Sequence, residues 1–145
     1  MAKIELSGFA ELEFDMEQWA NMPAEVFDQM VEVQLPIVEA ATKAEKWLLQ
    51  TSGRYVTGTT AGSVGHGKIK HSPTVTFAHV YPKGKNKKGN RNAEVGFIWE
   101  FGATTNMGVK IPPQQWMRIA AEKCGEEATD AAKKVLDAYL DSIHL

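Results

Sequence analysis

A glycine-rich segment is the first part of this 145-residue chain whose residue types and spacing could do chemistry. Gly62 to Lys68 read GSVGHGK and match the first seven positions of a phosphate-binding loop, in which backbone N–H groups cradle phosphates. The eighth position should be Ser or Thr to hold magnesium, but it is Ile69. The preceding TSGRYVTGTTA is polar and does not resemble the buried strand that such a loop follows. The segment therefore predicts no nucleotide site.

The histidines and the single cysteine are the other residues that could carry chemistry. His66, His71, His79 and His144 show no short metal-ligand spacing such as H-E-x-x-H. Cys124 cannot form an internal disulfide, and it falls on the apolar stripe of a predicted helix, where a buried thiol is inert packing. We therefore expect no catalytic residue, no cofactor and no metal ion, and a protein that is not an enzyme.

A basic segment is the one feature typical of contact with a polyanion. Its five positive charges lie within nine residues: Lys83, Lys85, Lys87, Lys88 and Arg91. They could neutralise several phosphates in a salt-dependent way, but without interleaved aromatic residues they would not read base sequence. The alternative is an exposed turn that its lysines keep from aggregating.

Charge is distributed in blocks along the chain. Residues 1–50 carry ten acids and three bases, residues 51–110 carry two acids and nine bases, and residues 111–145 carry six acids and four bases. Such blocks give one molecule complementary faces, which suits head-to-tail association of identical subunits or contact with a polyanion. The basic segment is therefore a candidate for either contact.

The length and composition predict one globular domain over residues 1–145. With 43% hydrophobic and 23% charged residues, the chain is neither disordered nor a membrane protein in composition. Its acidic beginning lacks the basic and apolar regions of a signal peptide, so we expect it to remain in the cytoplasm where it is made, with no membrane partner.

Periodicity predicts two long amphipathic helices and an antiparallel sheet, an α+β class. One helix begins near Met22 and carries an apolar stripe, and the other runs from Pro112 almost to His144. The stripes are Val26, Met30, Val33, Ile37, Ala40, Ala44 and Leu48 in the first helix, and Met117, Ala120, Cys124, Ala128, Ala131, Val135 and Tyr139 in the second.

Strands are expected between these helices, at residues 74–81 and 93–101, where β-branched and aromatic residues dominate. The basic segment between them would be the tip of a long hairpin, and residues 68–71 would add a third strand. Residues 51–67 contain many glycines and are expected to form an irregular connection that orders only against a neighbouring subunit.

Three segments together resemble a known family. TGTTAGSV (Thr57–Val64), WEFGAT (Trp99–Thr104) and PPQQWMRIA (Pro112–Ala120) are similar in sequence, order and spacing to motifs of the tail-completion, or head–tail joining, proteins of tailed bacteriophages. Thr60 departs from the pattern, which has Leu at this position, and residues 106–111 lengthen the loop before the final helix. The resemblance runs from the first helix to the last.

The resemblance implies a structural virion protein without a catalyst. It implies a homo-oligomeric ring, with a hexamer as the expectation, at the head-proximal end of a phage tail or of a phage-derived particle such as a tailocin. The partners would be tail terminator, tail tube or head connector proteins, and non-specific contact with DNA in the lumen stays open. The protein would lie in the virion, and in the host cytoplasm during assembly.

The motif positions are candidates for keeping the fold or for contacting another subunit: Thr57, Gly58, Ser63, Glu100, Phe101, Gly102, Pro113, Trp116 and Arg118. Two alternatives remain at this point. One is a tail terminator, which is a neighbouring ring protein of similar plan. The other is a small module that binds DNA non-specifically through the basic segment.

Overall fold

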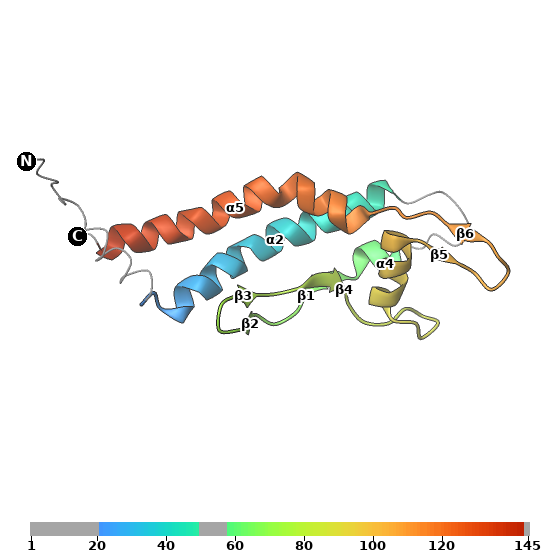
Figure 1. Ribbon diagram of the computed structural model, residues 1–145, viewed down its shortest axis with the longest axis horizontal. Helices are drawn as coiled ribbons and strands as arrows, with labels where there is room; N and C mark the ends of the chain where they lie inside the picture. The colour runs from blue at the N-terminus through green and yellow to red at the C-terminus, as the bar shows by residue number, and fades with distance from the viewer. Residues whose placement is uncertain (1–20, 50–57, 144–145) are drawn as a thin grey trace, which may run out of the picture.

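The computed structural model describes residues 21–49 and 58–143, which form an elongated α+β arrangement (Figure 1). In chain order the elements are α2 (Ala24–Leu48), α3 (Thr59–Gly62), β1 (Val64–His66), β2 (Lys70–His71), β3 (Thr76–Phe77), β4 (Val80–Pro82), α4 (Asn92–Phe101), β5 (Ala103–Thr104), β6 (Lys110–Ile111) and α5 (Trp116–Ile143). The predicted class is confirmed: two long helices pack with small antiparallel sheets.

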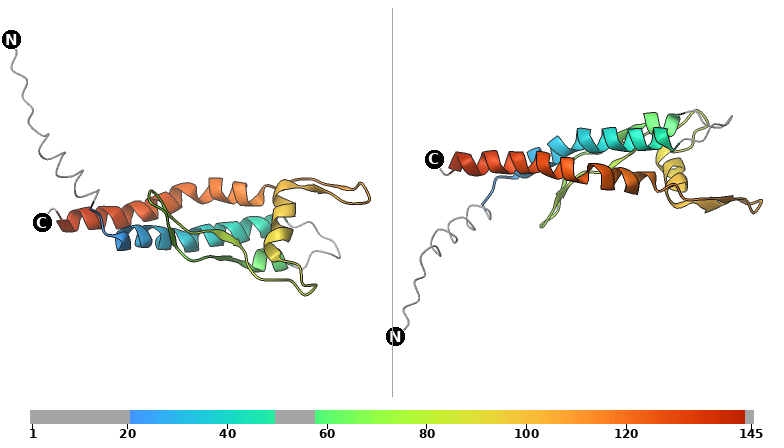
Figure 2. Two further views of the ribbon diagram at one scale, coloured as in Figure 1. Left: turned by 60° about the horizontal axis from the view of Figure 1, so that its bottom comes forward. Right: turned by 90° about the horizontal axis from the view of Figure 1, so that it is seen from above.

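The two long helices, α2 and α5, lie side by side and antiparallel (Figures 1 and 2). On α5 the buried positions recur every four residues, at Trp116, Ala120, Cys124, Ala128 and Ala132. Small side chains at this spacing let the two helix backbones approach closely. The predicted second helix is confirmed, and so is the burial of Ala120, Cys124 and Ala128 on its stripe.

The first predicted helix is also confirmed, but four of the seven residues in its predicted stripe are exposed: Val33 (36%), Ala40, Ala44 and Leu48 (73%). The buried face instead includes Val26, Leu35, Thr42, Glu45 and Lys46. The apolar pattern did not predict this face for two reasons. The helix α2 contacts α5 on one side and strands on another, and three of its five buried residues, Thr42, Glu45 and Lys46, are polar.

A two-stranded ribbon, residues 64–82, runs along α2 (Figure 2). β1 pairs antiparallel with β4, so that Val64 faces Pro82, and β2 pairs antiparallel with β3, so that Lys70 faces Phe77. Two histidines tie the ribbon to α2: His66 contacts the Glu39 carboxylate, and the His71 imidazole lies 3.3 Å from Asp28. The ribbon places the basic segment that follows it beside α4.

The connection expected to be irregular at 51–67 contains regular structure. Residues 51–57 lie outside the described residues, but residues 58–67 include α3 and β1. Val64 and Ala61 are buried, and Ala61 has no exposed surface. These two buried side chains supply apolar contacts that order the segment. The high glycine content of the sequence did not predict them.

The strand predicted at residues 93–101 is wrong, because this segment is the helix α4. Its buried residues, Asn92, Gly96 and Glu100, are spaced by four and share one helical face. None of the three is a large apolar residue, so the hydrophobic pattern did not reveal this period. The basic segment therefore joins a strand to a helix, although it still turns back on itself through an antiparallel bridge between Lys85 and Arg91.

Candidate functional site

The motif residues from α4 and from the start of α5 meet in one place, at the end of the helix pair where α4 crosses it (Figure 1). We call this cluster the motif junction and define it as Lys46, Glu100, Gly102, Gln114 and Trp116. Two backbone hydrogen bonds bring the segments together: the Gln114 N–H donates to the Trp99 carbonyl at 2.7 Å, and the Gln115 N–H donates to the Glu100 carbonyl at 3.2 Å.

Glu100 caps the first turn of α5. One carboxylate oxygen accepts the backbone N–H of Met117 at 2.7 Å, and the other accepts that of Arg118 at 3.3 Å. The residue is 5% exposed. The first N–H groups of a helix have no partner within the helix, and its N-terminus carries a partial positive charge. A buried carboxylate at this position therefore stabilises the start of α5, which fits the fold-keeping role expected for Glu100.

Trp116 anchors the start of α5 against α4. Its side chain is fully buried, and its indole N–H donates to the Gly96 carbonyl at 3.1 Å. A Cβ added at Gly96 would lie 3.2 Å from the indole ring and 2.9 Å from the Pro82 side chain. Position 96 therefore needs glycine for close packing, and Trp116 fixes the start of α5 on α4.

Lys46 brings a buried cation from α2 into the junction. It is 4% exposed, and its ammonium donates to the Gln114 side-chain carbonyl at 2.7 Å. The ammonium lies 4.9 Å from the ring centre of Trp99 and 5.6 Å from that of Trp116, both within the range of cation–π attraction. Burial lowers the pKa of Lys46 from 10.5 to about 8, and the negative charge of Glu100 acts in the opposite direction.

Gly102 provides the turn that sends the chain from α4 into the hairpin of β5 and β6. Its φ of 76° with a ψ of 169° belongs to a backbone region that is essentially restricted to glycine. A Cβ at this position would also lie 2.6 Å from the Ile111 carbonyl oxygen and 3.1 Å from the Pro113 nitrogen. The EFG motif thus has a physical basis: a capping carboxylate followed, two residues later, by a turn that excludes side chains.

The other motif residues lie around the junction or outside the described residues. Thr57 falls outside them. Gly58, with a φ of 72°, precedes α3 and leaves room for Trp47, whose ring would be 2.4 Å from an added Cβ. The Ser63 hydroxyl donates to the Thr60 carbonyl at 2.9 Å.

Three motif side chains near the junction face solvent. Phe101 is 73% exposed and Pro113 is also exposed. The Arg118 guanidinium lies 3.5 Å from Glu122 in an exposed pair. Of the candidate positions, Glu100, Gly102 and Trp116 are therefore internal to the fold, whereas Phe101, Pro113 and Arg118 are accessible to a partner.

Sequence reasoning missed Lys46, Gln114 and Glu45. The Gln114 side chain bridges the Lys46 ammonium and the Leu49 carbonyl, to which it donates at 3.0 Å, and Glu45 pairs with Lys123 at 2.7 Å. A signal was present, because Thr42, Glu45 and Lys46 continue the helical spacing of Leu35 and Val38. A pattern of apolar residues alone does not reveal this face, because Thr42, Glu45 and Lys46 are polar.

The basic segment forms a defined loop, and we call residues 83–91 the basic loop. The Asn86 side chain accepts the backbone N–H groups of Lys88 and Asn90, each at 3.0 Å. At its base, Asn92 donates to the Lys83 carbonyl at 2.8 Å. These contacts hold a short turn with charged side chains around it.

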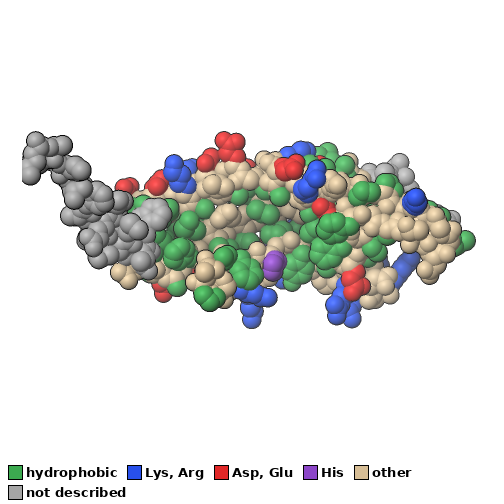
Figure 3. All heavy atoms as spheres, viewed as in Figure 1, with side chains coloured by type: hydrophobic (Ala, Val, Ile, Leu, Met, Phe, Trp, Pro, Cys, Tyr) green, Lys and Arg blue, Asp and Glu red, His purple; other side chains and the backbone are tan. Residues whose placement is uncertain are grey.

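The basic residues of the loop differ in their contacts. The Lys83 ammonium donates to the His66 carbonyl at 3.0 Å, and Arg91 lies 4.0 Å from Glu94. In the part of the chain that the structure describes, no ion pair or side-chain hydrogen bond engages the ammonium groups of the exposed Lys85, Lys87 and Lys88. Figure 3 shows lysine and arginine side chains along the lower edge of the molecule, below the helix pair.

No protein-family model, no curated protein and no solved structure matches this chain. Within residues 21–49 and 58–143, no group of three or more His, Cys, Asp or Glu side chains is arranged to hold a metal ion. None of the helices described there combines the length and apolar character needed to cross a bilayer.

Proposed function

We propose that the chain is a non-enzymatic structural subunit that forms a homo-oligomeric ring at the head-proximal end of the tail of a phage or phage-derived particle. The observation that carries this proposal is the motif junction. Two segments that resemble the tail-completion motifs, residues 99–104 and 112–120, interlock through Glu100, Gly102 and Trp116. This supports the resemblance because each shared residue has a role that depends on its side chain: Glu100 caps a helix, Gly102 makes a turn that excludes side chains, and Trp116 packs in the interior.

The reactive side chains of the junction and of the helix pair also support a structural role. The Glu100 carboxylate is engaged by helix N–H groups, and the Lys46 ammonium by Gln114. Cys124 is buried on the contact face of α5. Each of these groups is occupied in holding elements together, which is typical of a scaffold protein.

Exposed apolar side chains around α4 and the β5–β6 hairpin provide surface for partners. Ile98 is 42% exposed, Phe97 46%, Val109 59%, Phe101 73% and Met107 91%. Large apolar patches on a soluble protein mark interaction surfaces. Figure 1 places this hairpin at the end of the molecule opposite the C-terminal end of α5, where it is free to contact a neighbouring subunit or the adjacent ring.

The proposal is tested by the assembly state of the protein. We expect native mass spectrometry and negative-stain electron microscopy of the full chain to show a closed ring, either alone or after addition of the products of the neighbouring genes. A protein that stays monomeric in both situations at high micromolar concentration would contradict the proposal.

A second candidate function is non-specific DNA binding. It is favoured by Lys85, Lys87 and Lys88 of the basic loop, whose ammonium groups have no ion pair or hydrogen bond within residues 21–49 and 58–143. If all five cations of the loop contacted phosphates, the logarithm of the affinity would fall with the logarithm of salt concentration with a slope of about −4.5. A fluorescence-anisotropy titration with two unrelated duplexes measures this slope. Equal affinity for both duplexes and a steep slope would support the DNA module, whereas no binding at about 50 mM salt would exclude it.

A further inference from the structure

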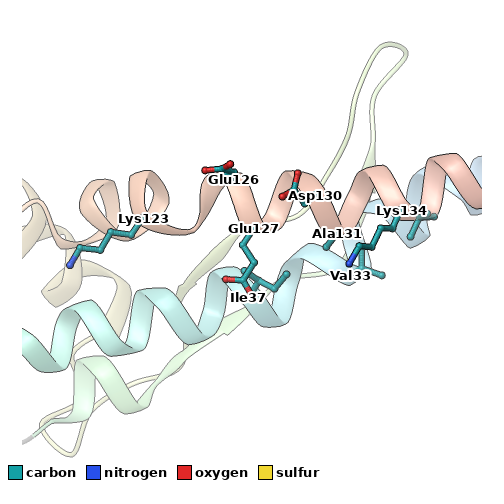
Figure 4. Close-up of a pocket in the computed structure, with 9 residues that line it drawn as sticks. Val33, Ile37, Lys123, Glu126, Glu127, Asp130, Ala131 and Lys134 are labelled. Atoms are coloured by element: carbon teal, nitrogen blue, oxygen red, sulfur yellow. The ribbon is translucent and has the colours of Figure 1, made fainter.

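A groove of about 750 Å³ runs between α2 and α5, away from the motif junction (Figure 4). Its apolar lining consists of Val33 and Ile37 from α2 with Ala131 and Val135 from α5, and its charged lining consists of Lys123, Glu126, Glu127, Asp130 and Lys134. Figure 4 shows Glu127 reaching from α5 toward Ile37, while Glu126 and Asp130 project from α5. The groove is thus apolar within and charged at its edge.

The charge at this edge is negative. The charged lining holds three acids, Glu126, Glu127 and Asp130, and two bases, Lys123 and Lys134. Lys123 is engaged by the buried Glu45 at 2.7 Å. In contrast, within the described residues no ion pair or hydrogen bond engages the carboxylates of Glu126, Glu127 or Asp130. The groove therefore carries three carboxylates that are available to an external cation.

The basic loop of the same chain carries the complementary charge, but it cannot reach this groove within one subunit. The loop lies between β4 and α4, near the motif junction, whereas the groove is formed by the middle parts of α2 and α5 (Figures 1 and 2). Two complementary surfaces that are separated on one molecule can only be joined between copies.

We propose that the basic loop of one subunit docks in the α2–α5 groove of a second copy. The contact rests on the proposed ring assembly and specifies where its subunits meet. Lysine suits this groove because its aliphatic stem can cover Val33, Ile37, Ala131 and Val135 while its ammonium reaches a carboxylate. The contact is heterologous, so its repetition must close into a ring or grow into a filament.

A second copy is favoured over two other partners. Docking of DNA on the loop would leave the acidic groove without a partner, whereas a second copy accounts for both surfaces. The first 20 residues of the chain carry five acids and one base, so the three groove carboxylates would repel them. Charge complementarity therefore selects the loop of a neighbouring subunit.

The test uses charge reversal in the full-length protein. The loop variant is Lys85→Glu/Lys87→Glu/Lys88→Glu, which leaves Lys83 and its hydrogen bond to His66 intact, and the groove variant is Glu126→Lys/Glu127→Lys/Asp130→Lys. Matched controls reverse exposed charges elsewhere: Lys68→Glu/Lys70→Glu/Lys110→Glu and Glu25→Lys/Asp137→Lys/Asp141→Lys. Far-UV circular dichroism verifies that each variant is folded.

Sedimentation velocity at about 50 and about 200 mM salt then reports the assembly state. We expect each of the two variants to associate at least about tenfold more weakly than the wild type, and both controls to assemble. An equimolar mixture of the loop and groove variants should assemble again, because each presents the charge that the other lacks.

The outcomes separate this contact from the proposed function. A wild type that never assembles overturns both. A wild type that forms rings while the loop variant also forms them overturns the contact and leaves the ring. Two weakened variants that do not recover on mixing overturn the specific pairing. A loop variant that forms normal rings but loses DNA affinity would assign the loop to DNA instead.

Discussion

The motif junction and the basic loop both contain charged side chains, but the junction buries them and the loop exposes them. In the junction, Lys46 and Glu100 are almost completely buried and each has a hydrogen-bond partner inside the chain. In the loop, Lys85, Lys87 and Lys88 are exposed. Burying a charge requires compensating partners, whereas an exposed charge keeps its hydration. The junction is therefore built to hold the fold, and the loop is available to a partner.

Removing the central side chain of the junction should have the largest effect. Trp116→Ala creates a cavity and breaks the bond to the Gly96 carbonyl, so we expect the free energy of unfolding to fall by about 3 to 5 kcal/mol. Urea denaturation followed by circular dichroism measures this change. Phe101→Ala, at a site that is 73% exposed, is the control and should change it by less than about 0.5 kcal/mol. Equal effects of the two substitutions would contradict the prediction that the motif junction contributes strongly to the stability of the fold.

The buried cation predicts a pH dependence of stability. The unfolded chain keeps the Lys46 proton up to its ordinary pKa of 10.5, but the folded chain releases it near 8. Between these values the unfolded state binds more protons, so the free energy of unfolding should rise with pH, by about 3 kcal/mol in total from this residue. Below pH 8 the residue adds no slope.

Denaturant titrations across this pH window check the expectation with two variants. Lys46→Met should lose the rise, whereas Lys43→Met, on the same helix, should keep it. A rise of equal size in both variants would show that another group is responsible.

Each of the two regions has a glycine with positive φ, so the same substitution can be made in both and its effect on stability compared. Gly102 in the junction has a φ of 76° and Gly89 in the basic loop a φ of 82°, but an added Cβ would meet the Ile111 carbonyl at Gly102 and open space at Gly89. Gly89→Ala should destabilise by about 1 to 2 kcal/mol through backbone strain alone. Gly102→Ala should destabilise by at least about 1 kcal/mol more, as thermal or urea unfolding would show. A smaller effect at Gly102 would mean that the turn can relax.

Charge reversal in the loop should have the smallest effect on stability. The lysines of the variant Lys85→Glu/Lys87→Glu/Lys88→Glu are exposed and make no ion pair within the described residues, so we expect a change within about 0.5 kcal/mol. Urea denaturation at low protein concentration measures this without interference from assembly. A loss of several kcal/mol would show that the loop supports the fold and is not simply a contact surface.

Part of this picture could be predicted from local pattern. The helical period marked α2 and α5, and the spacing of the motif segments drew attention to Glu100, Gly102 and Trp116 before their contacts were known. The run of lysines marked the basic loop. These features are local, since a helix period, a cluster of charges or a short motif lies within a few turns of chain.

The face of α2 and the nature of α4 could not be read in this way. Leu48 belonged to the apolar stripe but is exposed, while Lys46 lies in the interior. Residues 93–101 have strand-like composition, yet Asn92, Gly96 and Glu100 form the buried face of a helix. In each of these cases the decisive contacts come from residues far away in the chain.

The sequence by itself determined the α+β class, the two long helices and the separation of acidic from basic segments, because these follow from periodicity and composition over neighbouring residues. Only the tertiary structure decided which polar residues are buried and which apolar residues remain outside. Lys46 can be buried because Gln114, Trp99 and Trp116 reach it from more than 50 positions along the chain. A polar group can be buried only where the fold brings hydrogen-bond or charge partners to it. These partners come from distant parts of the chain, so a local sequence pattern does not predict them.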